Sequence, residues 1–197
     1  MRKEKRSQTQ QPPTLEQLTA ELARENYKRR FGRVLRSTLF TLVVVAAAAV
    51  LVATIWMPVL QIYGSSMTPT FKEGQIVVAV KGSSFEEGDI IAFYYGNKLL
   101  VKRYIAGPGS WVDIKEDGTV YVDGAELSEP YLTEKALGEC DMEFPYQIPE
   151  DRYFVLGDHR STSVDSRSSA IGCVAEEQIV GRIVFRIWPL TKIGIPG

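Results

Sequence analysis

The stretch Thr38–Leu60 reads TLFTLVVVAAAAVLVATIWMPVL and contains no charged side chain. Its 23 residues exceed the roughly 20 that a helix needs to cross the hydrocarbon layer of a membrane. A cleaved signal peptide has a shorter apolar region, and small residues stand at its cleavage site, whereas this stretch ends in Trp56-Met57-Pro58-Val59-Leu60. We therefore expect a single transmembrane helix at residues 37–60, with a buried core helix or a signal peptide as alternatives.

Charge is distributed unevenly on the two sides of this stretch. Residues 1–36 hold ten Lys and Arg against four acids, whereas the rest of the chain holds 13 against 20. Because positive charge favours the cytoplasmic side, we expect segment 1–36 inside the cell and residues 61–197 outside, across the cytoplasmic membrane. Thr14 and Gln17 predict the start of a short amphipathic helix, and residues 1–13 have the composition of a disordered tail.

After the span the pattern becomes that of β-strands. Short runs of β-branched and aromatic residues, separated by Gly, Asn or Pro, predict strands at residues 75–80, 89–94, 99–105, 152–156 and 179–187. Asp117-Gly118 stands between two further runs, 112–114 and 120–122, and predicts a hairpin. Residues 128–150 lack clear periodicity and are expected to be an excursion from the sheet. Residues 61–197 thus form one mainly β domain.

Ser66 lies in the polar stretch after the span and is a candidate nucleophile. The usual partner for such a serine is a histidine, and His159 is the only one in the chain. A single histidine beside Asp158 in a glycine-flanked turn is more typical of a hydrogen-bonded turn residue. One histidine and two distant cysteines also give no metal-ligand spacing, so we expect neither a metal nor another cofactor.

A lysine can replace the histidine when burial disfavours its charged form. Alternation along residues 99–105 places Lys102 on one face with Leu100 and Tyr104, and Arg103 on the other face. A buried amine becomes a general base near neutral pH, whereas a guanidinium stays protonated. The pattern by itself leaves Lys102 as either such a base or an ordinary exposed strand lysine.

Four motifs, taken in order, resemble the signature segments of type I signal peptidases. They are SMTPT at 66–70, GDIIAF at 88–93, Lys102-Arg103, and GDHRSTSVDSR at 157–167. The resemblance runs from the span to Arg167, and GRIVFRIWPL at 181–190 is compatible with it. It implies a β catalytic domain of the fold shared with LexA-type proteases, tethered by one N-terminal transmembrane helix. The implied activity is that of a serine endopeptidase that removes signal peptides.

The resemblance also implies a role for individual residues. Ser66 would attack the scissile carbonyl, and Lys102 would accept its proton. Ser163 would hydrogen-bond the lysine amine and orient it. Asp165 and Arg167 would form a supporting ion pair near the site. Asp158 and Arg160 would stabilise the same turn and would not touch the substrate.

The substrates implied are exported preproteins with small residues at the last and third-last positions of the signal peptide. Shallow apolar pockets would select these small residues, and the candidate lining residues are Leu60, Ile62, Met67, Leu100 and Val101. For each of them, ordinary packing in the hydrophobic core is the alternative. The expected partners are signal peptides, the lipid bilayer and the protein translocation machinery, and no nucleic acid.

Three positions depart from the family's pattern. Gly64 stands where some members carry a serine that donates to the oxyanion, His159 stands where Asn is usual, and Ser110 ends a turn that commonly ends in Asp. We therefore expect backbone N–H groups, such as that of Ser66, to stabilise the oxyanion.

Two other functions remain open. One is a catalytically silent membrane-tethered binding or assembly module of the secretion machinery, which an intact Ser66 and Lys102 disfavour. The other is a LexA-type self-cleaving protease, which the membrane span disfavours. Cys140 and Cys173 are expected to be free thiols, with a disulfide as the alternative outside the membrane.

Overall fold

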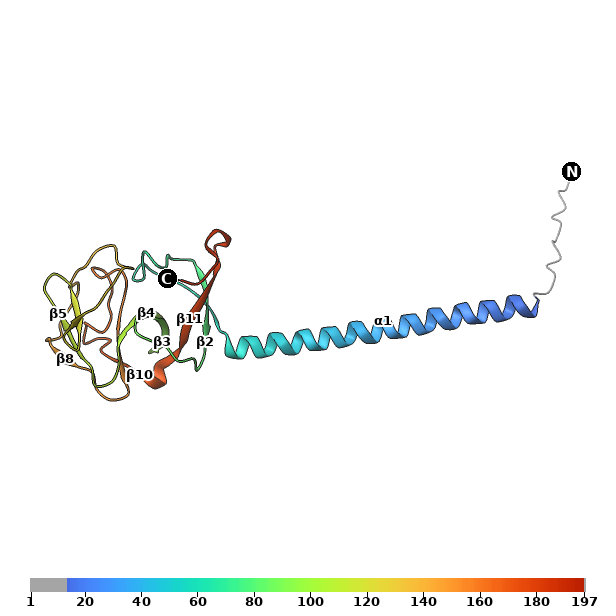
Figure 1. Ribbon diagram of the computed structural model, residues 1–197, viewed down its shortest axis with the longest axis horizontal. Helices are drawn as coiled ribbons and strands as arrows, with labels where there is room; N and C mark the ends of the chain where they lie inside the picture. The colour runs from blue at the N-terminus through green and yellow to red at the C-terminus, as the bar shows by residue number, and fades with distance from the viewer. Residues whose placement is uncertain (1–13, 197) are drawn as a thin grey trace. The chain divides into compact units, whose positions relative to one another are not determined.

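The computed structural model describes residues 14–196, which form one long helix and a β domain (Figure 1). The chain divides into two compact units at Leu51 and Val52. Helix α1 spans Leu15–Trp56 without a break, so the predicted amphipathic helix and the predicted span are parts of one helix. The Thr14 N–H donates to Gln17 Oε1 at 3.1 Å at its start. The tail predicted at residues 1–13 lies outside the described residues.

The helix ends at Trp56, before the predicted end of the span at Leu60. Pro58 lacks an N–H and disfavours the helical conformation of Met57, so the chain becomes extended and forms β1 (Val59–Gln61). The uncharged part of the helix, residues 37–56, is about 30 Å long at 1.5 Å per residue. That length still matches the hydrocarbon thickness of a bilayer.

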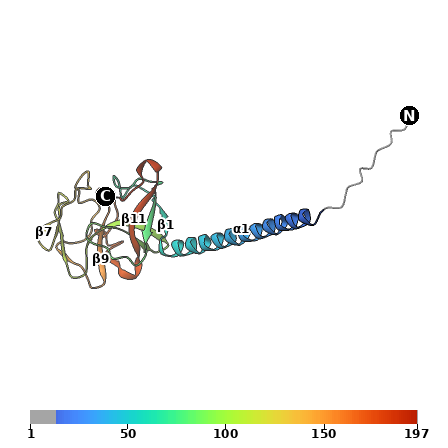
Figure 2. The same ribbon diagram turned by 45° about the vertical axis from the view of Figure 1, so that its right-hand side comes forward.

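The domain contains two antiparallel sheets, drawn from two directions in Figures 1 and 2. The larger sheet has the order β1-β2-β11-β3-β4-β9-β10, and the smaller sheet has the order β7-β6-β5-β8. In the larger sheet β1 is followed by β2 (Ile76–Val80), β3 (Ile90–Tyr95), β4 (Lys98–Ala106), β9 (Arg152–Leu156), β10 (Val174–Ala175) and β11 (Ile179–Trp188). The smaller sheet contains β5 (Trp111–Ile114), β6 (Val120–Val122), β7 (Ala125–Glu126) and β8 (Tyr146–Gln147), and two short 3-10 helices are η1 (Glu176–Gln178) and η2 (Leu190–Lys192).

Each predicted strand is present, and the predicted hairpin joins β5 to β6. Four short strands, β1, β7, β8 and β10, were not predicted. Residues 127–145 contain no strand or helix, which agrees with the predicted excursion. Hydrophobic residues pack in three clusters, and the cluster built around Phe71, Val77 and Ile62 holds the segment that follows β1.

Strands β1 and β4 both have an edge in the larger sheet that lacks a neighbouring strand. Strand β1 pairs only with β2 and ends the sheet. Strand β4 pairs with β3 along residues 98–103, but β9 pairs with it only between Arg103 and Ala106. The edge of β4 at residues 98–102 is therefore open on the β9 side, and Lys102 lies at the end of this open edge.

Candidate active site

Ser66 lies in a tight turn that follows β1. Gly64 opens the turn with a φ of 77°, a backbone conformation that glycine adopts readily. The Thr68 N–H donates to Ser65 O at 3.0 Å, and the Phe71 N–H donates to Met67 O at 2.7 Å. Met67 and Phe71 are buried in the hydrophobic core, which anchors the turn and leaves Ser66 half-buried at the surface of the domain.

Lys102 is a buried lysine, with 3% of its surface exposed. Its Nζ donates to Ser163 Oγ at 2.7 Å. Burial lowers the pKa of this amine to about 8; Asp165 opposes the shift, Arg167 adds to it, and Asp158 also opposes it. The exposed-lysine alternative is therefore wrong, and a usable fraction of the amine is neutral near physiological pH.

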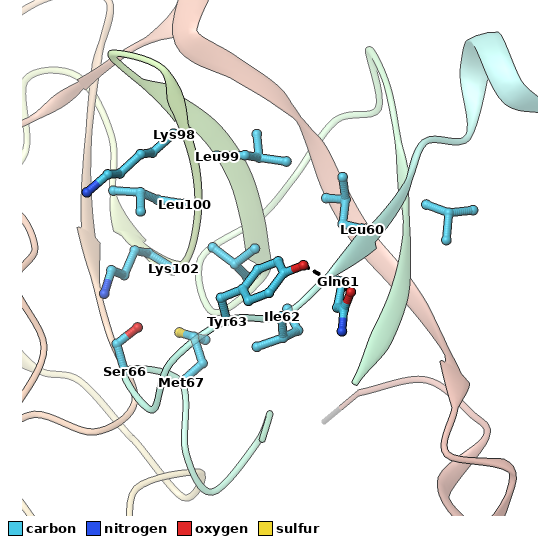
Figure 3. Close-up of a pocket in the computed structure, with 12 residues that line it drawn as sticks. Leu60, Gln61, Ile62, Tyr63, Ser66, Met67, Lys98, Leu99, Leu100 and Lys102 are labelled. Atoms are coloured by element: carbon cyan, nitrogen blue, oxygen red, sulfur yellow. Dashed lines mark hydrogen bonds between the residues drawn. The ribbon is translucent and has the colours of Figure 1, made fainter. Parts of the chain in front are cut away.

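Ser66 and Lys102 line the same groove. Figure 3 shows the serine hydroxyl and the lysine amine at one end of it, with Leu60 and Gln61 on the opposite side. Within residues 14–196 no hydrogen bond joins the two side chains, and the amine donates to Ser163 Oγ instead. A neutral amine that donates one hydrogen to Ser163 keeps its lone pair free to accept a proton.

Gly157 brings the nucleophile turn and the Ser163 turn into close contact. A Cβ atom at this position would lie 2.1 Å from Ser163 Oγ and 2.6 Å from Ser66 O. The His159 N–H donates to Ser66 O at 3.0 Å from the same turn. The start of the GDHR motif is thus a glycine because no side chain fits between the two serines.

Asp165 and Arg167 form a buried ion pair with two hydrogen bonds of 2.8 Å each. Asp165 Oδ2 also accepts the Gly157 N–H at 2.9 Å. Arg167 Nη2 donates to Arg160 O at 2.9 Å and to Ser163 O at 3.2 Å. The pair therefore holds the turn from Gly157 to Ser163 at several points.

Asp158 lies in the same turn but faces the other side of β4. It accepts two hydrogen bonds from Arg103, Nε to Oδ1 at 2.9 Å and Nη2 to Oδ2 at 2.7 Å. Thr70 Oγ1 also donates to Asp158 Oδ2, at 2.5 Å. The sequence marked Arg103 only as a residue that cannot act as a base. In the structure Arg103 links β4 to the nucleophile segment through Thr70 and to the 157–163 turn through Asp158.

Two residues of the excursion, Glu129 and Tyr131, contact the site and were missed. Glu129 forms an ion pair with Arg160, and both side chains are almost fully buried. The Tyr131 hydroxyl donates to Glu129 Oε1 at 3.0 Å, and its ring lies 3.7 Å below the Arg103 guanidinium. Burial raises the pKa of Tyr131. Glu129 and Tyr131 stand alone in an irregular segment, so no periodic pattern in the sequence indicated their contacts.

The groove has a volume of about 530 Å³. All five predicted pocket residues line it: Leu60, Ile62, Met67, Leu100 and Val101. The other lining residues, besides Ser66 and Lys102, come from β1, β4 and the segment after β1: Val59, Gln61, Tyr63, Lys98 and Leu99. In Figure 3, Lys98, Leu100 and Lys102 project to one side of β4 and Leu99 to the other. The open edge of β4 therefore lies along the groove.

The other residues singled out in the sequence lie outside the groove that holds Ser66 and Lys102. His159 Nδ1 lies 3.1 Å from Thr68 Oγ1, and Ser110 stands in the turn between β4 and β5. Cys140 and Cys173 are free thiols, and burial raises the pKa of Cys173 to about 11. Among residues 14–196, no three His, Cys, Asp or Glu side chains gather in a metal-binding cluster.

Comparison with known proteins finds a matching family and several relatives. The family model "Signal peptidase, peptidase S26" matches residues 35–188. Signal peptidase IB of Staphylococcus aureus is 38% identical over 151 residues, which cover 66% of this chain and 78% of that protein. Signal peptidase I of Bacillus licheniformis is 34% identical over 165 residues, which cover 77% and 87%.

One solved structure is also similar, a crystal structure of a signal peptidase I from Enterococcus faecalis. It is 31% identical, with a TM-score of 0.42, and the match covers 51% of this chain and 97% of that chain. The family model alone spans most of the sequence and includes both Ser66 and Lys102. The chain therefore belongs to the S26 family of signal peptidases.

Proposed function

We propose that this chain is a membrane-bound serine endopeptidase that cleaves signal peptides from exported preproteins, with Ser66 as nucleophile and Lys102 as general base. The observation that carries the proposal is the buried Lys102 amine, whose pKa is lowered to about 8, in one groove with Ser66. Because a general base works best when its pKa lies near the working pH, this amine suits the role.

The reaction begins when neutral Lys102 takes the Ser66 proton as Oγ attacks the scissile carbonyl carbon. The new C–O bond sends the carbonyl electron pair to oxygen and forms an oxyanion. Within residues 14–196 the Ser66 N–H donates to no acceptor, and it is available to this oxyanion. Gly64 has no side chain to assist, so the stabilisation comes from the backbone.

The intermediate then collapses. Its C–N bond breaks, and the Lys102 ammonium gives its proton to the leaving amine, which is the new N-terminus of the mature protein. Neutral Lys102 next takes a proton from a water molecule that attacks the acyl ester on Ser66. The ester C–O bond breaks, and the Lys102 ammonium returns its proton to Ser66 Oγ. The signal peptide leaves as a carboxylic acid, which loses its proton to solvent. Ser163 orients the amine throughout, because its Oγ accepts one N–H of Lys102.

The groove suits a substrate in extended conformation. The open edge of β4 and the free edge of β1 both border it, so a peptide can add to them through backbone hydrogen bonds. Alternate side chains of such a peptide then point to Leu60, Ile62, Met67, Leu100 and Val101. Ile62 and Met67 are almost fully buried, which leaves shallow space beside Ser66 and favours small residues there.

The membrane brings the substrate and the enzyme together in this proposal. The basic segment 1–36 lies in the cytoplasm, residues 37–56 cross the cytoplasmic membrane, and the domain lies outside. Large exposed apolar side chains follow one another at the end of β11 and beyond it, where they suit contact with lipid: Phe185, Ile187, Trp188, Leu190, Ile193 and Ile195. Preproteins arrive from the translocation machinery with their apolar segment already in the bilayer.

A cleavage assay tests the proposal. The purified full chain in detergent should cut a preprotein after the small residue of its Ala-x-Ala site, and addition of a chelator should not change the rate. S66A, K102A and K102R should each be inactive, since the arginine keeps the charge but cannot act as a base. Turnover by K102A would refute the dyad.

The same assay separates the alternative functions, neither of which any observation favours. A silent binding module would retain the preprotein without cleaving it. A self-cleaving protease would shorten its own chain on incubation, which mass spectrometry of the enzyme alone would detect.

A further inference from the structure

His159 contacts the nucleophile turn at two points. Its backbone N–H donates to Ser66 O at 3.0 Å, and its ring Nδ1 lies 3.1 Å from Thr68 Oγ1. The His159 carbonyl oxygen accepts the Ser163 N–H at 3.0 Å. This one residue therefore connects the turn that carries the nucleophile to the residue that orients Lys102.

The hydrogen bonds of Thr68 decide which atom of His159 carries a proton. Thr68 Oγ1 lies 2.8 Å from Ser65 O, and a carbonyl oxygen can only accept. The hydroxyl has one hydrogen, and that hydrogen is used in this bond. Thr68 Oγ1 must therefore accept from the His159 ring, so Nδ1 is the donor. The neutral ring must be the Nδ1–H tautomer, and the doubly protonated ring also satisfies the contact.

We propose that His159 is a positioning residue for the nucleophile, through donation of its Nδ1–H to Thr68. The proposal rests on the proposed function, in which Ser66 is the nucleophile. Any residue at 159 can supply the backbone bond to Ser66 O, but the bond to Thr68 needs a donor at the place of Nδ1. An Asn side chain can present its amide N–H there, whereas Ala has no donor and Gln extends one methylene too far.

The tautomer can be read without any substitution, because His159 is the only histidine in the chain. Nitrogen-15 NMR of the full chain, free of histidine tags and labelled at histidine, should give one signal from each ring nitrogen. When the ring is neutral, at alkaline pH, we expect its single proton on Nδ1. A bare Nδ1 with a proton on Nε2 would overturn the proposal.

Two threonine variants act as a matched pair for this spectrum. T68V removes the acceptor of the Nδ1–H and should shift the Nδ1 signal. T162V changes an exposed side chain of the His159 turn and should leave the signal in place. Equal shifts in the two variants would show that the signal does not report the contact with Thr68.

Kinetics tests whether the contact positions Ser66. H159A and H159Q should lower kcat about tenfold, the rate equivalent of one hydrogen bond, with KM changed less than about twofold. H159N should recover most of the lost kcat. The double variant H159A/T68V should lose no more than the larger single loss, because both changes remove the same bond. An unchanged kcat in H159A, no recovery in H159N, or additive losses would each contradict the proposal.

The two proposals fail in different ways. If S66A kept its activity, the proposed function would be wrong, while the Nδ1 signal would still report the bond to Thr68. If H159A does not fold, H159Q, T68V and the spectrum of the unaltered chain still decide the question.

Discussion

Replacement of Lys102 by Met should abolish activity and stabilise the folded domain at neutral pH. Burial lowers the pKa of the amine from 10.5 to about 8. A pKa difference of one between the folded and the unfolded chain is equivalent to about 1.4 kcal/mol. The charged amine therefore costs the folded state about 3 kcal/mol at neutral pH. Met fills similar space without charge, but it leaves Ser163 Oγ without the Lys102 hydrogen bond, a loss of about 1 kcal/mol. The net gain is about 2 kcal/mol.

The pH dependence of this gain follows from the lowered pKa. Below pH 8 the lysine is protonated in both the folded and the unfolded chain, and the full cost is present. Between about 8 and 10.5 the unfolded chain binds more protons than the folded one, so the stability of the unaltered protein rises with pH. The advantage of K102M should therefore be largest below pH 8 and disappear as the pH approaches 10.5.

Thermal unfolding of the full chain in detergent, followed by tryptophan fluorescence at several pH values, measures this difference. For a domain of this size about 2 kcal/mol corresponds to a rise in Tm of about 5 °C. K98M is the matched control, because Lys98 is exposed on the same strand and its replacement should change Tm little. A K102M variant less stable than the parent at pH 7, or a Tm difference independent of pH, would refute the argument that Lys102 is destabilised by burial.

Three further substitutions test the surroundings of the dyad. S163A removes the acceptor of the Lys102 amine and should lower kcat about tenfold or more, with little change in KM. The control S161A, at an exposed position of the same turn, should have the kcat of the parent. Equal kcat values for S163A and S161A in a steady-state assay would argue against orientation of Lys102 by Ser163. G157A places a Cβ 2.6 Å from Ser66 O and should lower kcat about a hundredfold. In the control G32A the new Cβ has no other atom within 4 Å, and kcat should not change. A G157A variant as active as the parent would mean that the two turns move apart freely. E129Q leaves Arg160 buried without its charged partner Glu129 and should lower the unfolding free energy by about 3 kcal/mol. Denaturant titration measures this loss, with E177Q at an exposed position as the control. Equal stabilities of E129Q and E177Q would show that Glu129 does not stabilise the turn.

The sequence was most informative where one local pattern decides the structure. The uncharged run predicted the membrane-length helix, and alternation predicted the strands that carry Lys102. The end of the helix was placed too late because Val59 and Leu60 are apolar, and they look the same in a membrane span as in a strand. Their pairing with Val78 and Val77 of β2 is a tertiary contact, and no local pattern contains it.

The candidate site was predictable in its motifs but not in its connections. The serine, the lysine and the 157–167 motif were found by residue type and order. The contacts of Arg103 with Asp158 and Tyr131, and of Glu129 with Arg160, join segments separated by dozens of residues. Such pairs depend on how the excursion packs on the sheet, and single charges in an irregular segment do not reveal it. The tautomer of His159 likewise required the geometry of Thr68.

The pH dependence of kcat/KM for preprotein cleavage tests most directly whether Lys102 is the general base. With a pKa of about 8, about one tenth of the amine is neutral at pH 7 and about nine tenths at pH 9. We expect kcat/KM to rise about tenfold over this interval, with a midpoint near pH 8. A profile that is flat between pH 7 and 9, or one whose rising limb has its midpoint near 6.5, where imidazoles usually titrate, would contradict the assignment of the base to Lys102.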